Sequence, residues 1–167
     1  MIFPRLIKAS LLFGGEGGNG VLIARSPDGS WSDPAFYSLG APSVGLQIGY
    51  QEATVILFVM DDVAFRTMLG SSVALGANTT VAVGDIGDAE KAEGEVIDKP
   101  IYQLVEAGGV FAGVSLDGYV IAPRSRHNFA YYGASGSPTA ILLDRSVSNH
   151  EARVLHDALG AGRRATP

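Results

Sequence analysis

Apolar and polar side chains alternate along several stretches of the chain, as expected of β-strands that bury one face. The clearest alternation spans residues 43–50, where Val44, Leu46, Ile48 and Tyr50 share one face. The opposite face carries two glycines, which would let another backbone approach closely. The pattern predicts further strands over residues 5–13, 20–24, 53–60, 73–84, 101–108, 109–116 and 119–124.

A short helix is predicted in the middle of the chain, over residues 61–70. Asp61 can cap the free amide groups at its start. Gly70 can end it in the left-handed conformation. The polar, acidic residues 85–100 that follow the next predicted strand are expected to form a loop.

Two further helices are predicted near the end of the chain, over residues 137–144 and 148–160. In the second, Ser148 or Asn149 can act as the cap and Gly160 ends the helix. Its apolar side chains form one stripe, which consists of Val154, Leu155, Ala158 and Leu159.

These elements predict an α+β fold with a predominantly antiparallel sheet, curled or packed as a barrel or sandwich. A short mid-chain helix and C-terminal helices complete it. Asp117 and Gly118 form a strong two-residue hairpin signal between two strands. No linker divides the chain, so we expect a single domain over residues 1–160 and a frayed tail over residues 161–167.

The composition restricts the class of protein. Of 167 residues, 47% are hydrophobic and 17% are charged, which argues against disorder. The net charge of -5 argues against nucleic acid as a partner, because phosphate binding needs a concentrated basic face. The absence of cysteine excludes disulfides and thiolate metal sites. No apolar run approaches the roughly 18 residues of a membrane-spanning helix, and no signal peptide is visible.

Gly15, Gly17 and Gly20 have the G-x-G-x-x-G spacing of nucleotide-binding loops. A dinucleotide site requires a helix after that loop, whereas residues 21–25 have the pattern of a strand. The lysine, H-R-D and D-F-G motifs of protein kinases are missing, and Glu16 would repel a phosphate. We therefore interpret the cluster as a connection between two strands, whose glycines permit tight backbone packing.

Motifs for nucleophilic or metal chemistry are incomplete. Ser115 lies on a predicted hairpin and not between a strand and a helix, as a G-x-S-x-G nucleophile would. The histidines lack metal-binding spacing and are interpreted as surface or capping residues: His127, His150 and His156. Two acidic pairs are interpreted as capping or solvated, namely Asp61 with Asp62 and Asp85 with Asp88. We predict a protein that is not an enzyme and that uses no cofactor, and we assign no metal-binding residues.

Basic side chains occur in a few groups. Arg5 and Lys8 flank the first predicted strand, and Arg124 and Arg126 follow residues 119–123 together with His127. These groups could converge into an anion-binding patch for lipid headgroups. An ordinary charged rim is the alternative that the residues alone leave open. Two more arginines close the chain, Arg163 and Arg164.

Four blocks carry a resemblance to a known family: "FPRLIKASLLFGGEGGNGVLIAR", "GSWSDPAFYSLGAPSVGLQIGYQEATVILFV", "GVFAGVSLDGYVIAP" and "NFAYYG". In this order, from residue 2 to the terminal helix, they resemble the SYLF domain family. The resemblance implies a noncatalytic module that engages phosphoinositides or other anionic phospholipids. It also implies actin binding in fungal and animal members, and an envelope-associated or periplasmic location in bacterial ones.

The resemblance also assigns residues to the family's blocks. The positions that fall in these blocks are Lys8, Gly15, Gly17, Gly20, Trp31, Gly45, Gln47 and Gly49, while Arg124 and Asn128 fall near the last block. Members usually have a helical segment ahead of the block that begins here at residue 2, and we expect this chain to lack it. No catalytic set follows from the resemblance.

Two hypotheses of function result. In the first, the chain is a peripheral module that binds anionic phospholipid headgroups at a membrane surface, with Arg5, Lys8, Arg124 and Arg126 as the contact residues. In the second, it is a protein-interaction or assembly module, similar to an actin-binding protein or an envelope scaffold. The bare strand faces and exposed sheet edges would then receive a protein partner or a second copy.

Overall fold

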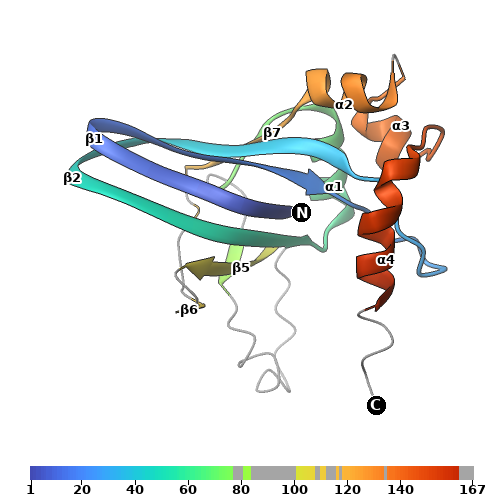
Figure 1. Ribbon diagram of the computed structural model, residues 1–167, viewed down its shortest axis with the longest axis horizontal. Coiled ribbons are helices and arrows are strands. Elements are labelled where there is room, and N and C mark those ends of the chain that lie inside the picture. Colours follow the sequence, from blue (N-terminus) through green and yellow to red (C-terminus); the bar gives the residue numbers. More distant parts are fainter. Residues whose placement is uncertain are drawn as a thin grey trace. The chain divides into compact units, whose positions relative to one another are not determined.

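The computed structural model of the chain describes residues 1–76, 81–83, 101–107, 110–111, 116, 118–133 and 135–161 (Figure 1). Its elements are β1 (Ile2–Leu22), β2 (Ala35–Val59), α1 (Asp62–Gly70), β3 (Val73–Ala74), β4 (Val81–Val83), β5 (Ile101–Ala107), β6 (Val110–Phe111), β7 (Val120–Pro123), α2 (Ser125–Tyr132), α3 (Pro138–Leu142), the 3-10 helix η1 (His150–Ala152) and α4 (Arg153–Ala161). Some predicted features lie outside the described residues, namely the loop with Asp85 and Asp88, Ser115, Asp117, Arg163 and Arg164.

The chain divides into two compact units. The first comprises Met1–Val21 and Tyr37–Pro123, and it contains nearly all of the sheet. The second comprises Leu22–Phe36 and Arg124–Pro167, and it contains α2, α3, η1 and α4.

Among the described residues, the first unit is built on a seven-stranded sheet. Its strands lie in the order β3-β7-β2-β5-β4, while β1 pairs with β2 and β6 pairs with β5. β2 is antiparallel to both β5 and β7, β3 is antiparallel to β7, and β4 is parallel to β5. The predicted α+β fold with a predominantly antiparallel, curled sheet is confirmed.

β1 doubles back on itself (Figure 1). A straight strand of its length would span about 65 Å, yet a Cβ on Gly20 would lie 2.2 Å from the carbonyl oxygen of Ile2. A Cβ on Gly18 would likewise lie 2.4 Å from the carbonyl oxygen of Arg5. The predicted interruption of the strand at the glycine cluster is wrong, because β1 continues to Leu22. The predicted close packing is confirmed at Gly18 and Gly20, since only residues without a Cβ fit there.

β2 also turns back, so that its two ends pair with different strands (Figure 1). Residues 37–40 pair with β7 and residues 53–59 pair with β5. The strands predicted at residues 43–50 and 53–60 are therefore parts of one strand. This strand also contains the family-matched Gly45, Gln47 and Gly49.

Apolar side chains from the sheet and α1 fill the core of the first unit. The most deeply buried are Phe3, Tyr37, Leu39, Val55, Leu57, Met68, Leu75, Ile101, Leu116 and Ile121. The hydroxyl of Tyr37 donates a hydrogen bond to the carbonyl oxygen of Met68 at 2.9 Å, which ties the sheet to α1. Burial of this hydroxyl raises the pKa of Tyr37.

The predicted start of α1 is confirmed, and the predicted manner of its end is wrong. The carboxylate of Asp61 accepts a hydrogen bond from the Ala64 N–H at 2.7 Å, as an N-cap does. At the other end, Gly70 is the last helical residue and does not have a positive φ. Ser71 follows with φ −152°, and its N–H donates to the carbonyl oxygen of Thr67 at 3.2 Å. The chain thus leaves the helix directly into an extended conformation.

A turn precedes β7, as the sequence predicted. Gly118 has φ 81°, and the Tyr119 N–H donates to the carbonyl oxygen of Leu116 at 3.1 Å. These are the features of a turn that needs glycine at its third position. Among the described residues, β7 then pairs with β2 and β3.

Both helices predicted near the end of the chain are present in the second unit. Asn149 is the cap that precedes η1, because its side-chain oxygen accepts from the Glu151 N–H at 3.0 Å. α4 follows and extends one residue beyond Gly160. The predicted single apolar stripe is wrong: Leu155 is half-buried, whereas Val154 keeps 78% of its surface exposed.

Candidate functional site

The basic residues predicted to bind lipid headgroups are divided between the two units. Arg5 lies on β1 in the first unit, and its guanidinium pairs with the carboxylate of Glu52 on β2. Lys8 lies on the same strand, and its side chain is outside the described part of the structure. Arg124 and Arg126 lie at the start of α2 in the second unit. Glu52 offsets the charge of Arg5.

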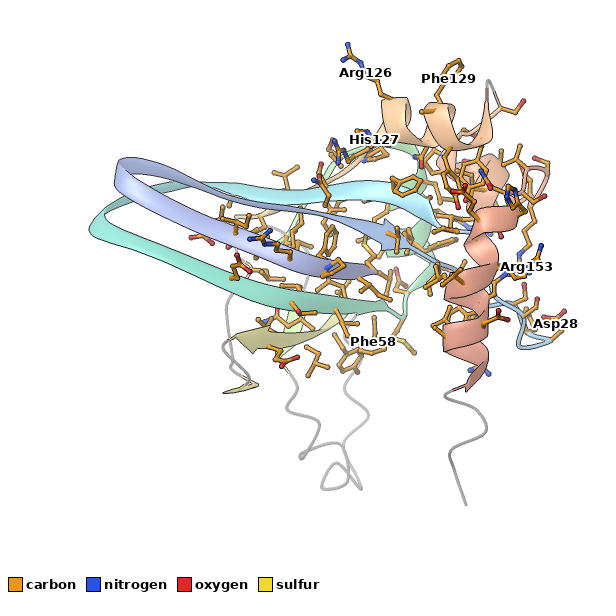
Figure 2. The ribbon with its side chains drawn as sticks, viewed as in Figure 1. Asp28, Phe58, Arg126, His127, Phe129 and Arg153 are labelled. Carbon is orange, nitrogen blue, oxygen red and sulfur yellow. The ribbon has the colours of Figure 1, made fainter. Side chains whose placement is uncertain are left out.

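α2 presents an exposed face that combines a cation with an aromatic ring. Arg126 and Phe129 are three positions apart and therefore share one face of the helix. Both are exposed, and Phe129 keeps 60% of its surface accessible. Figure 2 shows these two side chains projecting away from the helix. No acidic residue occurs between Ser125 and Tyr132, so the charge of this face is positive.

Asn128 anchors the opposite face of α2. Its side chain is completely buried, and its Oδ1 accepts a hydrogen bond from the Phe36 N–H at 2.7 Å. Its Nδ2 donates to the carbonyl oxygen of the same residue at 3.4 Å. A Cβ on Gly136 would lie 2.5 Å from the Asn128 carbonyl oxygen, so the chain passes this helix in close contact. The buried amide thus fixes which face of α2 remains exposed.

Aromatic side chains hold α2 to residues 34–36. The rings of Phe36 and Tyr131 meet edge to face at 5.2 Å, and the rings of Tyr131 and Tyr132 at 4.8 Å. The Tyr132 hydroxyl donates to the carbonyl oxygen of Pro34 at 2.7 Å. Burial raises the pKa of Tyr132, and the negative charge of Asp33 raises it further. These contacts make α2 a rigidly held platform for its exposed face.

His156 and Asp33 form a polar cluster that ties α4 to the loop after β1. The Nε2 of His156 lies 3.3 Å from Oδ1 of Asp33 and 3.1 Å from the Ser32 carbonyl oxygen. The other Asp33 oxygen accepts from the Asn149 N–H at 2.8 Å. The Ser32 hydroxyl instead accepts from the Ala24 N–H and donates to the Asp33 carbonyl oxygen. Histidine therefore does not activate this hydroxyl, and the cluster is not a Ser-His-Asp triad.

Trp31 lies at the base of a tight turn. It pairs with Arg25 in an isolated β-bridge, and the Arg25 guanidinium lies 5.6 Å from the centre of the indole ring. Arg145 closes the turn by donating to the Ser30 hydroxyl at 2.8 Å. Hydrogen bonds from Ser30 lower the pKa of Asp28, and Arg145 adds to this effect. The family-matched tryptophan thus belongs to a structural turn.

Neither a metal centre nor a membrane-spanning helix is found among the described residues. In that part of the chain, no three His, Cys, Asp or Glu side chains are grouped so as to hold a metal ion. None of the described helices has the length and hydropathy of a transmembrane span.

Sequence reasoning did not single out Phe129 because it did not predict α2. The N-cap residue Arg124 makes no side-chain cap hydrogen bond, and the buried residue of the helix is the polar Asn128. A helix that buries an amide and exposes a phenyl ring does not show the apolar period of an amphipathic helix. The signals in this region were the neighbouring Arg124 and Arg126 and the family block of residues 128–133.

Comparison with known proteins gives consistent matches. The sequence model of the family Ysc84, described as "Las17-binding protein actin regulator", matches residues 40–162. A human protein named "SH3 domain-containing YSC84-like protein 1" is 34% identical over 158 residues, which are 92% of this chain and 46% of that protein. Its Xenopus laevis counterpart is 33% identical over 159 residues, 92% of this chain and 47% of that protein. "Protein YSC84" of Saccharomyces cerevisiae is 28% identical over 144 residues, 84% of this chain and 31% of that protein. The chain thus spans less than half the length of these relatives.

Proposed function

Because the chain belongs to the Ysc84 family of actin regulators, the SYLF domain family, we propose that it is a noncatalytic module that binds anionic phospholipid headgroups at a membrane surface. Headgroups of the phosphoinositide type carry the phosphate charge that such a module would engage. The exposed face of α2, formed by Arg126 and Phe129, is the observation that carries the proposal.

The pairing of a cation with an exposed ring suits the boundary between water and lipid. A guanidinium interacts with headgroup phosphates, while a phenyl ring gains by entering the acyl region beneath them. The ring of Phe129 is 60% exposed to water, and transfer of this apolar surface from water into lipid would be favourable. The anchoring of α2 by Asn128 keeps both side chains outward and lowers the ordering cost of binding.

Electrostatics favours one orientation of the protein on the membrane. Its net charge of -5 opposes approach to an anionic surface in most orientations. Each basic residue near such a surface contributes about 1 kcal/mol, so Arg124 and Arg126 together would strengthen binding about 30-fold. We therefore expect binding that weakens with salt and that depends on the exposed face of α2.

Vesicle co-sedimentation with a matched pair of variants tests the proposal. The double variant Arg126→Glu/Phe129→Ser removes both features of the α2 face. Its control is Arg153→Glu/Val154→Ser, because Arg153 and Val154 are an exposed basic and apolar pair on α4. Asp157, one turn further along α4, offsets the charge of that pair.

The expected result is binding to vesicles with anionic lipids and none to neutral vesicles. The α2 double variant should bind at least tenfold more weakly, while the α4 control should bind as the parent protein does. Equal binding to neutral and anionic vesicles would refute the proposal. So would an α2 variant that binds as well as its control.

A second candidate function is protein interaction without direct lipid contact. The family description, with its reference to Las17 and to actin regulation, favours this candidate. Co-sedimentation with purified actin filaments tests it. The candidate requires that more protein pellets with filaments than without them, and an unchanged pellet would count against it for actin.

A further inference from the structure

A separate group of exposed apolar side chains lies in the first unit, at the corner where β2 passes into α1. Phe58, Met60 and Val63 have 53%, 70% and 71% of their surfaces exposed. Phe58 and Met60 point outward because they alternate along the extended chain with the buried Leu57 and the half-buried Val59. Only five positions separate Phe58 from Val63, so the three exposed side chains lie close together along the chain at this corner. We refer to them as the apolar corner.

Two acidic residues lie in the sequence between members of the apolar corner. Asp61 and Asp62 lie between Met60 and Val63, and both are exposed. The hydrogen bond from the Ala64 N–H fixes the carboxylate of Asp61 in place. Arg66, on the next turn of α1, offsets one of the two charges. The corner therefore combines apolar contact area with a net negative charge.

This charge decides which partner fits. An anionic membrane would be repelled by Asp61 and Asp62, in contrast to its attraction to Arg126 on α2. A second acidic surface would be repelled as well. A helix that carries apolar side chains on one face and lysine or arginine beside them would complement both the apolar side chains and the carboxylates. We propose that the apolar corner binds a basic amphipathic helix of a protein partner.

The size of the corner sets the expected strength of binding. Three apolar side chains with two flanking carboxylates form a contact smaller than the roughly 1,200 Å² of a stable interface. Binding should therefore be transient, with a dissociation constant of about 1–100 μM. Its electrostatic part should weaken as the salt concentration rises.

Two designed peptides provide the probe. One is a synthetic amphipathic helix of leucine and lysine, and the other has the same pattern with glutamate in place of lysine. Fluorescence anisotropy of the labelled peptides measures their affinity for the protein. We expect the lysine peptide to bind and the glutamate peptide to bind at least tenfold more weakly.

Matched variants locate the binding site. Phe58→Ser and Val63→Ser each remove one apolar side chain of the corner. Their controls are Phe129→Ser and Val154→Ser, which make the same changes at slightly more exposed sites of the second unit. We expect each corner variant to weaken lysine-peptide binding about fivefold to tenfold, and each control to leave it unchanged. Asp62→Asn should weaken it and reduce its salt dependence.

A second measurement does not depend on the stability of the variants. A benzophenone amino acid at position 60 should cross-link to the lysine peptide, and the same group at position 154 should not. Thermal unfolding of every variant checks that it is folded. Equal binding of both peptides, equal losses in the corner and control variants, or equal cross-linking at the two positions would each overturn the proposal. Vesicle binding, measured in parallel, should respond to Phe129→Ser and not to Phe58→Ser.

Discussion

Substitution of Gly20 by alanine should destabilise the protein strongly, because the added methyl group would meet backbone. A Cβ at this position would lie 2.2 Å from the Ile2 carbonyl oxygen and 2.9 Å from its carbonyl carbon. The first distance is about 1.2 Å shorter than the 3.4 Å at which ordinary contact begins. It would also lie 2.5 Å from the ring of Phe3, which is itself completely buried. Neither neighbour can move without disturbing the pairing of β1 or the core.

The size of the effect follows from the cost of overpacking. Excess methylene groups in a packed core cost about 1–3 kcal/mol, and a clash with backbone should reach the upper end of this range. For a chain of this length, about 3 kcal/mol lowers the midpoint of thermal unfolding by about 6–12 °C. The control is Gly17→Ala, whose Cβ would lie 3.6 Å from the Leu39 carbonyl oxygen. Because this is ordinary contact, the control should leave the stability unchanged or raise it by about 0.4–1 kcal/mol, since alanine reduces the conformational entropy of the unfolded chain.

Thermal and urea-induced unfolding, followed by circular dichroism, measures both effects. Gly17 and Gly20 belong to the same G-x-G-x-x-G match, so the motif itself gives no reason for them to differ. A large loss of stability in Gly20→Ala, with none in Gly17→Ala, would support close packing between the two halves of β1. Similar results at both positions, whether large or small, would refute this account of the glycine cluster.

Three further substitutions test individual contacts. Asn128→Ala should lower the free energy of unfolding by about 1–3 kcal/mol, because it leaves the part-buried Phe36 N–H without its acceptor; unfolding in urea measures the loss. Asp61→Ala should cost about 1 kcal/mol through the lost cap of α1, also measured in urea. Tyr37 has a raised pKa in the folded state, so its contribution to the free energy of unfolding is complete below about pH 10. That contribution is lost above about pH 10, as the tyrosine hydroxyl ionises in the unfolded chain. Tyr37→Phe should therefore flatten the fall in stability between about pH 10 and pH 12, and an unchanged slope would contradict the burial of this hydroxyl.

The pattern of the sequence predicted the class of fold because strand alternation and helix caps are local signals. Asp61 is an example, since its role as a cap needs only the residues next to it. The doubling back of β1 and β2 could not be predicted in this way. Contacts such as Gly20 with Ile2 join residues far apart in the sequence, and glycine alone does not say which backbone approaches it.

The candidate site was predictable only in part. Arg124 and Arg126 were visible as a basic pair, whereas Phe129 became a candidate through its exposure on α2. The helix was missed because its buried residue, Asn128, is polar and acts through Phe36, which is distant in the sequence. A buried amide of this kind gives no hydrophobic period.

Environment-sensitive fluorescence at position 129 tests the central claim most directly. The chain contains no cysteine, so Phe129→Cys provides one labelling site for a nitrobenzoxadiazole probe, and Val154→Cys provides the matched control on α4. Membrane contact through the exposed face of α2 predicts that anionic vesicles shift the emission of the probe at position 129 to the blue and raise its intensity. The probe at position 154 should not respond, and neutral vesicles should change neither. An unresponsive probe at position 129, or an equal response at both positions, would contradict the account.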